Sequence, residues 1–414
     1  MVEKATFRRH ASYSALRGPA IALSTQLAAF VAIKSLGATE RQAILLAFAL
    51  PLGNLMAIFW SRMMVRRRRL PWAVWPDFVG FLLLFPIAFV VDPIWFIVLV
   101  FGTTLLRSSA IVALSGIIRD NYPGAVRAQT MGKVQAGALG AMAISGLVFG
   151  KILELDPSAY RFIYPFSAIL GFIAVYRLSG VPESDPRERL FGREPSLLDI
   201  WHVLRSDRDF LYYQISFFIF GLAAMMLNAL LPLYLAQDLQ VDYVSGAIAL
   251  VVITSGLPVL TSPIWGRMID RNNVLVMRGL FNLVWALCPF IIVATHSVAG
   301  VYAGQILVGF IQGGSMLVWN LGVNIFARKV EVPTYMGIHQ TLTGARGLIA
   351  PVLGLWLAYT FAAQGAEVPA YRTVFLLCGV LMLGAGIFMV WEGRAMEAKG
   401  RAVTFKLADE RETA

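Results

Sequence analysis

Charged residues are scarce in this chain, and acidic residues are scarcer than basic ones. Asp, Glu, Lys and Arg make up 14% of its 414 residues, with 24 acidic and 35 basic side chains. Soluble domains carry roughly 25% charged residues. Hydrophobic residues reach 58%, and the mean hydropathy is +0.69. This composition excludes an ordinary soluble globular protein and indicates an all-α polytopic membrane protein.

Groups that perform covalent or metal chemistry are also few. The two cysteines, Cys288 and Cys378, lie in apolar stretches, and neither has metal-ligand spacing. The phosphate-binding pattern G-x-x-x-x-G-K-[ST] is missing; its nearest approach, Gly150-Lys151, is followed by Ile152. No apolar stretch combines a nucleophile with a base. We therefore expect no enzyme activity, no cofactor, no metal and no ATP-driven pumping by this chain.

Long apolar stretches fill most of the sequence. A bilayer core about 30 Å thick needs roughly 20 apolar residues of helix, and we predict twelve transmembrane helices of about that length. Their expected ranges are 13–36, 41–62, 72–91, 94–118, 128–152, 160–180, 210–236, 243–265, 274–295, 299–326, 336–361 and 371–392.

Basic residues crowd every second gap between these stretches. Of the 35 Lys and Arg, we place most at the two termini and in the even-to-odd connections. The exceptions are Lys34, Arg41, Lys151, Arg161 and Arg372 on the other side, and Arg17, Arg107 and Arg346 within spans. The positive-inside rule then predicts an integral plasma (cell inner) membrane protein with both termini cytoplasmic. We attribute the net charge of +11 to anionic lipid headgroups, not to nucleic acid.

The longest polar segment divides the chain in the middle. We expect a six-helix bundle over 1–181, a cytoplasmic linker over 182–208, a second bundle over 209–392 and a cytoplasmic tail over 393–414. Within the linker, Ser196 can cap a helix whose Leu197, Leu198, Trp201 and Leu204 share one face. This pattern is typical of an amphipathic helix on a membrane surface. An ordinary linker with incidental apolar residues is the alternative.

An internal repeat supports the same division. The segment Trp60–Arg66 reads WSRMMVR, and the segment Trp265–Arg271 reads WGRMIDR, 205 residues later. Met131-Gly132 and Met336-Gly337 match at the same offset. Two matches at one offset indicate two homologous halves, an arrangement typical of transporters.

These segments resemble a known family. Gly266–Arg271 resembles the loop signature G-x-x-x-D-R of the major facilitator superfamily, which lies between helices two and three and again between eight and nine. Arg107 is similar to the membrane-embedded arginine of the family's fourth helix. The first signature departs from the pattern, with Ser61 for glycine and Val65 for aspartate. The resemblance implies twelve helices in two pseudo-symmetric six-helix bundles, alternating access and a monomer.

The resemblance also implies a gate. A carboxylate at a helix end can interact with a neighbouring helix N-terminus and with arginines, and so hold one side shut. A solvated turn at the membrane edge is the alternative. The expected gating residues are Arg62, Arg66, Gly266, Arg267, Asp270, Arg271 and Asp77.

Two arginines, Arg107 and Arg346, fall deep within predicted spans. Each costs about 2.5–3.5 kcal/mol at a helix centre, yet the spans hold almost no acid. Asp77 is the sole candidate, and its place near the end of its span suggests Arg17 or the Arg62–Arg69 cluster as its partner. We therefore expect the missing anion to be the substrate, since arginine binds carboxylate and phosphate in a bidentate way. The alternative is a structural role against backbone carbonyls.

Further polar side chains follow the same helix faces. His339, Thr343 and Arg346 share one face of a helix, and Gln312 and Trp319 share a face of the preceding one. His339 is the only histidine within a span, and it can carry a coupling proton. Interhelical hydrogen bonding is the alternative for all of these residues. The predicted substrate-binding residues are Arg107, Arg346, His339, Thr343, Gln312, Trp319, Asn320, Asn228 and Gln26.

The leading functional hypothesis is a secondary active or facilitative transporter of a small organic anion. Its partners are the small-molecule substrate, H⁺ or a counter-anion, and the lipid bilayer. A multidrug or lipid exporter of the same fold is the first alternative. A transporter-like sensor or assembly factor without flux is the second.

Overall fold

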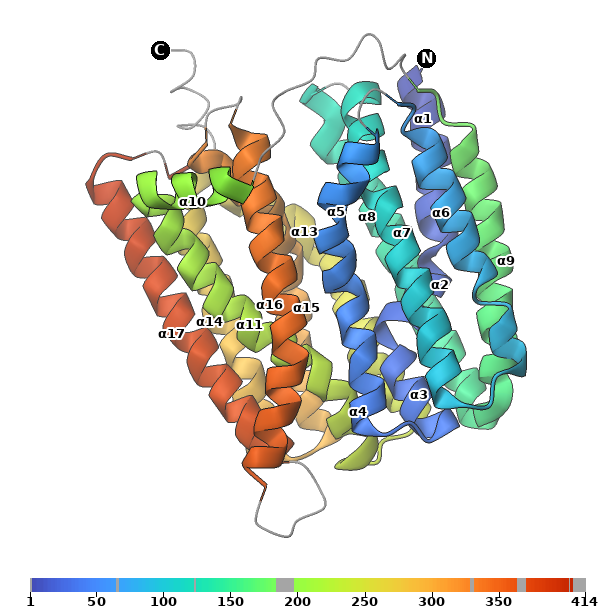
Figure 1. Ribbon diagram of the computed structural model, residues 1–414. Coiled ribbons are helices and arrows are strands. Elements are labelled where there is room, and N and C mark those ends of the chain that lie inside the picture. Colours follow the sequence, from blue (N-terminus) through green and yellow to red (C-terminus); the bar gives the residue numbers. More distant parts are fainter. Residues whose placement is uncertain are drawn as a thin grey trace. The chain divides into compact units, whose positions relative to one another are not determined.

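Helices form all the regular structure of the described residues (Figure 1). The computed structural model describes residues 2–64, 67–122, 124–183, 197–327, 331–362, 370–401 and 403–404. The predicted all-α class is confirmed. Within those ranges ten helices are long and apolar enough to cross a membrane, or eleven if the bent pair Glu3–Gln26 and Ala28–Leu36 counts as one span. The second expected span, 41–62, is helical throughout but is not among these ten.

The chain packs into two compact units. Unit 1 consists of Met1–Leu190 and Leu231–Val259, and unit 2 of Phe191–Leu230 and Leu260–Ala414. The bundle boundaries expected at 181 and 209 stay a prediction.

Unit 1 contains the helices of the first half of the chain and short helices from the second half. They are α1 (Val2–Leu16), α2 (Gly18–Ile21), η1 (Ala22–Gln26), α3 (Ala28–Leu36), α4 (Glu40–Ala43), η2 (Ile44–Phe48), α5 (Ala49–Met64), α6 (Leu70–Leu82), η3 (Pro86–Phe89), α7 (Pro93–Asn121), α8 (Gly124–Leu155), η4 (Pro157–Ala159), α9 (Tyr160–Ser179), α12 (Tyr243–Ala247) and η6 (Ile248–Val252).

Local sequence explains several of these boundaries. Asp92 caps α7 by accepting a hydrogen bond from the Ile94 amide, and Pro93 occupies the first helical position. Thr39 and Gln42 form a reciprocal capping box at the start of α4. Gly37, with φ of 67°, ends α3 in the left-handed conformation that glycine adopts without steric cost.

Glycines bring α6 close to its neighbours in unit 1. A β-carbon on Gly80 would lie 3.2 Å from the Thr103 carbonyl of α7, and one on Gly171 of α9 would overlap the buried Phe81 ring. Close approach therefore requires the smallest side chain at both positions.

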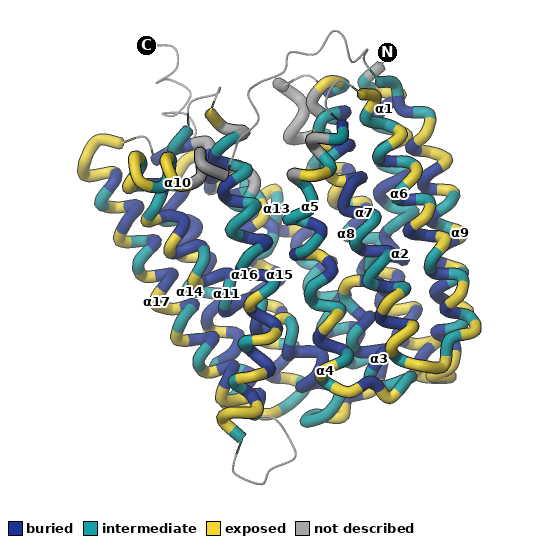
Figure 2. Tube along the Cα trace, viewed as in Figure 1, coloured by how far each residue is buried: buried dark blue, intermediate teal, exposed yellow. Residues whose placement is uncertain are grey.

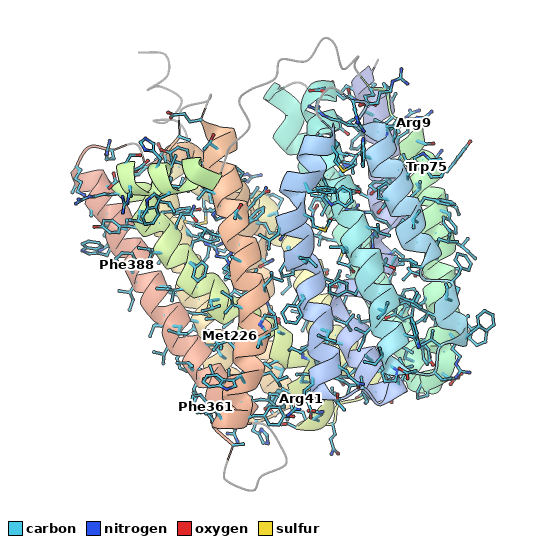
Figure 3. All side chains as sticks on the ribbon, viewed as in Figure 1. Arg9, Arg41, Trp75, Met226, Phe361 and Phe388 are labelled. Carbon is cyan, nitrogen blue, oxygen red and sulfur yellow. The ribbon has the colours of Figure 1, made fainter. Side chains whose placement is uncertain are left out.

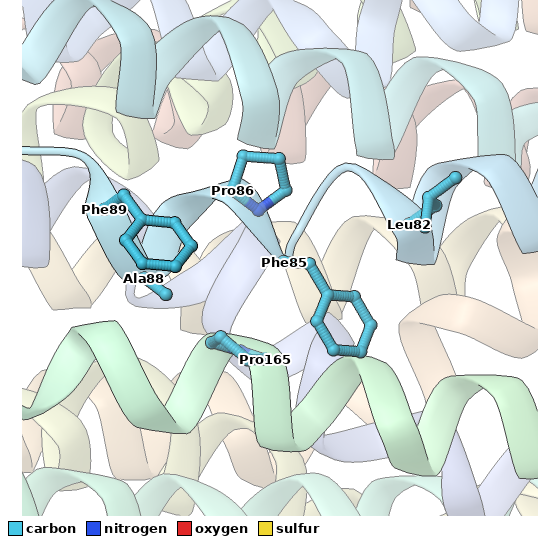
Figure 4. Close-up of a pocket in the computed structure, with 6 residues that line it drawn as sticks. All are labelled: Leu82, Phe85, Pro86, Ala88, Phe89 and Pro165. Carbon is cyan, nitrogen blue, oxygen red and sulfur yellow. The ribbon is translucent and has the colours of Figure 1, made fainter.

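Beyond Leu82, the short turn of η3 and Pro165 line an apolar notch of about 480 Å³ (Figure 4).

Unit 2 contains the surface helix and most of the remaining spans. They are α10 (Leu197–Ser206), α11 (Arg208–Gln237), α13 (Ile253–Arg271), α14 (Val274–Thr295), α15 (Val298–Leu321), η7 (Gly322–Ile325), α16 (Val332–Thr360) and α17 (Tyr371–Ala398). The ends of α11 and α13 that lie in Leu231–Val259 belong to unit 1.

The segment predicted to form an amphipathic helix is helical, as α10, and its place on a membrane surface stays a prediction. Its Trp201 is 60% exposed, and the Arg205 guanidinium lies 4.2 Å from the centre of the Trp201 ring. The side chains of Leu197 and Leu198 lie outside the described residues. An exposed tryptophan beside an arginine suits a membrane surface.

The repeat is visible in both sequence register and contacts. α7 begins at Pro93 and α15 at Val298, which again differ by 205 residues. Trp60 of α5 donates to the Ser108 hydroxyl of α7 over 3.0 Å, and Trp265 of α13 donates to the Phe310 carbonyl of α15 over 2.6 Å. Equivalent tryptophans therefore join equivalent helix pairs.

Candidate functional site

Unit 1 contains a buried ion pair between adjacent helices. Asp77 of α6, fully buried, accepts from Arg107 Nε of α7 over 3.1 Å. The Tyr13 hydroxyl donates to the other Asp77 oxygen over 2.8 Å, and Arg17 Nη1 donates to Tyr13 over 2.6 Å. The Arg107 guanidinium also lies 4.8 Å from the centre of the Phe81 ring. All four polar groups form one chain of hydrogen bonds.

This pairing corrects two expectations from the sequence. Arg107 does have an acidic partner, so the expectation that it lacks one is wrong. Asp77 was expected to contact Arg17 or the Arg62–Arg69 cluster directly. Instead, the Tyr13 hydroxyl lies between Asp77 and Arg17 and hydrogen-bonds to both. The physical reason is that α6 and α7 run past one another, and Gly80 lets the Arg107 stem pass against its backbone. The position of Asp77 near the end of its predicted span did not reveal that Arg107 lies at the same level on the neighbouring helix.

The interior of unit 2 is arranged around the ring of Phe217 on α11. The guanidinium carbons of Arg278 and Arg346 lie 4.3 and 5.2 Å from its centre, so they are within 9.5 Å of each other. The His339 ring meets Phe217 edge-on, with centres 4.6 Å apart. Arg278 and Arg346 are 3% and 4% exposed. Two buried cations therefore lie against one aromatic ring.

Both arginines bond to neutral oxygens. Arg346 Nη1 donates to the Phe217 carbonyl, and its guanidinium lies where a side chain on Gly221 would be. Arg278 Nη1 donates to the Ser315 carbonyl over 3.2 Å and to the Ser315 hydroxyl. No carboxylate pairs with either arginine in the part of the chain that the structure describes. Their charge is therefore uncompensated there.

Further donors around this cluster lack partners. His339 Nδ1 lies 3.2 Å from Gln214 Oε1. Nε2 of His339, Nε2 of Gln214 and the Nε atoms of Arg278 and Arg346 are buried without a hydrogen bond among described atoms. Buried polar groups are normally paired, so four unpaired nitrogens in one place favour a site for an acceptor-rich ligand. We name Gln214, Arg278, His339 and Arg346 the donor cluster.

The remaining predicted binding residues are distributed unevenly. The Trp319 ring is tilted against the His339 ring, with ring centres 5.6 Å apart, whereas the Thr343 hydroxyl donates to the His339 carbonyl of its own helix. Gln312 is half-buried, and its Oε1 has no hydrogen-bond partner among the described residues, whereas Asn228 is exposed. Gln26 lies in unit 1, where it donates weakly to Ser255 over 3.5 Å. The side chains of Asn320 and Asn324 lie outside the described residues.

The expected gate of the loop signature is not paired here. Arg267, Asp270 and Arg271 are exposed, and none of the described ion pairs includes them. A β-carbon on Gly266 would meet only Leu317, at 3.7 Å, so packing does not require glycine there. Arg66 and the side chain of Arg62 lie outside the described residues. The gating role of this segment stays a prediction.

A different set of contacts joins helix ends in unit 1, at the end of α3 that is far from the N-terminus. Lys34 Nζ donates to the Val241 carbonyl and lies 5.0 Å from the centre of the Tyr243 ring. The Tyr243 hydroxyl is 2.5 Å from Ser35 Oγ, and its amide donates to Glu154 over 2.6 Å. These contacts tie α12 to α3 and α8.

Sequence reasoning missed Arg278 and Glu392. Arg278 was counted with the loop cations because it lies near the start of its span, yet it is buried among aromatic rings. Glu392 of α17 is 2% exposed, and neither carboxylate oxygen has a hydrogen-bond partner in the described structure. It was missed because it is the last residue of its predicted span, 371–392, where a charged residue is expected to face water.

The repeat offset contained a further signal. Adding 205 residues to Asp77 gives Asn282, and adding 205 to Arg107 gives Gln312. Asn282 is fully buried, and both of its amide atoms lack partners among described residues. The charged residues of the ion pair in unit 1 thus have two neutral amide residues at the equivalent positions of unit 2.

Comparisons with known proteins agree with this architecture. A family model described as Major Facilitator Superfamily matches residues 19–324 and 249–406. No curated protein sequence matches the chain.

Several solved structures share the fold at low identity. A point mutant of the nucleoside transporter NupG has a TM-score of 0.74 at 11% identity, covering 94% of this chain and 99% of that one. A bacterial homologue of the human lysosomal transporter Spinster has a TM-score of 0.67 at 14% identity, covering 97% and 98%. The human organic anion transporter MFSD10 has a TM-score of 0.65 at 13% identity, covering 94% and 99%. Such identities establish the fold and not the substrate.

Proposed function

The chain belongs to the Major Facilitator Superfamily, and from this premise we propose that it transports a small organic anion by alternating access. It is a multi-pass membrane protein with the fold of that family's transporters. The proposal concerns the substrate class and the residues that bind it.

The observation that carries the proposal is the uncompensated charge of the donor cluster. At a separation of no more than 9.5 Å, two guanidinium groups repel by at least about 1.7 kcal/mol at an effective dielectric constant of about 20. Burial of each costs about 2.5–3.5 kcal/mol more on insertion scales. Unit 1 offsets this cost with Asp77, whereas a bound anion can offset it in unit 2.

The unpaired nitrogens define how such an anion is held. Nε of Arg278 and Nε of Arg346 can each donate to a carboxylate, sulfonate or phosphate oxygen, and charge-assisted bonds of this kind are the strong ones. Nε2 of Gln214 can donate to a second acceptor. Nε2 of His339 can donate when the imidazole is charged, because its Nδ1 already donates to Gln214 Oε1. The rings of Phe217 and Trp319 beside these donors favour an anion with an organic body. A structurally similar protein is named a human organic anion transporter, and this supports the proposed substrate class.

We extend the proposal to orientation and coupling. The distribution of Lys and Arg supports cytoplasmic termini in the plasma membrane. Coupling to H⁺ is compatible with the donor cluster, because protonation of His339 changes the net charge of the cluster. Coupling to a counter-anion is compatible as well, because an anion bound in exchange for the substrate would also change that charge.

The test combines ligand-induced stabilisation with transport. Wild-type protein in detergent is screened against organic mono- and dicarboxylates, sulfonates and phosphate esters, with neutral and cationic compounds of matched size alongside. The best ligand is then measured in proteoliposomes for wild type, Arg278→Gln, Arg346→Gln and the exposed control Arg394→Gln. We expect anions alone to stabilise, and both cluster variants to lose at least tenfold in apparent affinity. Stabilisation by cations or neutral compounds, or undiminished anion uptake by Arg346→Gln, refutes the proposal.

A further inference from the structure

A basic groove lies between α1 and α9 of unit 1, at the end that carries the N-terminus. Its lining includes Arg8 and Arg9 of α1 and Tyr176 and Arg177 of α9, and its volume is about 630 Å³. Arg9 is labelled there in Figure 3. Nothing in the proposed transport cycle uses this groove.

Among the residues that the structure describes, no acidic side chain pairs with the three arginines of the groove, Arg8, Arg9 and Arg177. Glu183, the nearest acid in sequence to this end of α9, instead accepts from the backbone amides of Arg69 and Leu70. The groove therefore favours a ligand with uncompensated negative charge.

Arg9 occupies a defined position in the groove. A β-carbon on Gly180, the residue that follows α9, would coincide with the Arg9 guanidinium. Gly180 has φ of −93° and ψ of 9°, a conformation open to alanine. The space beside Gly180 is therefore filled by the end of the Arg9 side chain, which an alanine would displace. This position also lies at the C-terminal end of α9, where a cation interacts favourably with the helix dipole.

An apolar stripe on α9 leads to the groove. Its members recur every three or four residues and are 45–75% exposed (Figure 2). They are Phe162, Phe166, Ile169, Ile173 and Tyr176. In a span of this hydropathy such a face lies against lipid tails. A ligand that fills the groove and continues along the stripe has a charged head and a long apolar tail.

We propose that this groove is a binding site for an anionic phospholipid, whose phosphate contacts Arg8, Arg9 and Arg177 and whose acyl chain lies along α9. Three arginines repel the ammonium group of a zwitterionic lipid, so the site selects a headgroup of net negative charge. Juxtamembrane cations gain about 1 kcal/mol each from anionic lipid, which corresponds to about fivefold in affinity per arginine.

The experiment measures lipid-induced thermal stabilisation of delipidated full-length protein in a non-ionic detergent. Phosphatidylglycerol, phosphatidylcholine of the same chains, glycerol phosphate and inorganic phosphate are titrated separately. We expect stabilisation by phosphatidylglycerol alone. Its half-saturating concentration should rise about fivefold in Arg9→Gln and on the order of 100-fold when all three arginines are changed to glutamine.

Two further variants separate the site from general charge and from folding. Gly180→Ala keeps every charge but displaces the Arg9 guanidinium, and it should weaken phosphatidylglycerol binding about as much as Arg9→Gln. Arg394→Gln removes an exposed cation of α17 and should change nothing. The proposal is overturned if the triple variant or Gly180→Ala binds as wild type, or if Arg394→Gln loses as much. Equal protection by inorganic phosphate would instead assign the groove to free phosphate.

Discussion

The ion pair of unit 1 can be tested with the protein's own repeat as a guide. Because unit 2 has Asn282 and Gln312 at the equivalent positions, the double variant Asp77→Asn/Arg107→Gln gives unit 1 the two neutral residue types that unit 2 already has. We expect the two single variants to be strongly destabilising and the double variant to recover most of the loss.

The magnitude follows from the geometry. At 3.1 Å the attraction between the two charges is about 5 kcal/mol at an effective dielectric constant of about 20. Removing one partner of a buried pair costs about 3–5 kcal/mol, because the other charge is left buried and uncompensated. In the double variant the new asparagine amide can still accept from Tyr13 and face the new glutamine amide, so its stability should lie within about 1 kcal/mol of wild type. The coupling energy is then at least about 5 kcal/mol, above the usual range of about 0.5–3 kcal/mol for neighbouring residues.

The assay is equilibrium unfolding in mixed micelles for the four corners of the double-mutant cycle. Ser109 supplies the control, because its buried hydroxyl also joins α7 to α6, through the Trp72 carbonyl over 3.0 Å, without any charge. Ser109→Ala should cost about 1 kcal/mol and add to the effect of Asp77→Asn without coupling. Additive effects of Asp77→Asn and Arg107→Gln, or a double variant as unstable as the singles, would show that the pair is not the buried electrostatic unit described here.

Three further outcomes follow from buried groups elsewhere. Arg346→Gln should raise the unfolding free energy of ligand-free protein by about 1–3 kcal/mol, since relief of charge burial and repulsion outweighs one lost charge-assisted bond; a lower unfolding midpoint would contradict this. Glu392→Gln should leave stability unchanged or raise it by up to about 2 kcal/mol, because an unpaired buried carboxylate is replaced by a neutral group, and destabilisation in the same micelle assay would reveal a partner for the carboxylate. Gly171→Ala should destabilise by about 1–3 kcal/mol by overpacking Phe81, whereas Gly140→Ala, with open space around it, should stabilise by up to about 1 kcal/mol; equal effects on the unfolding midpoint would refute the packing argument.

Hydropathy alone identified this chain as an all-α membrane protein, because the absence of water in a bilayer forces apolar, internally hydrogen-bonded helices. The WSRMMVR and WGRMIDR segments gave the repeat offset of 205 residues that also separates the starts of α7 and α15, because an internal repeat is recorded in the sequence itself. The same offset already related Asp77 and Arg107 to two neutral amide residues.

The depth and direction of each charged side chain were decided only by tertiary structure. Asp77 and Arg107 are thirty residues apart and meet because α6 and α7 pack at the distance that Gly80 permits. Arg278 resembles a loop cation in the sequence, yet packing turns it inward onto Phe217 beside Arg346. Sequence periodicity fixes which face of a helix a residue occupies, but partners across helices depend on crossing angles and offsets that one helix does not encode.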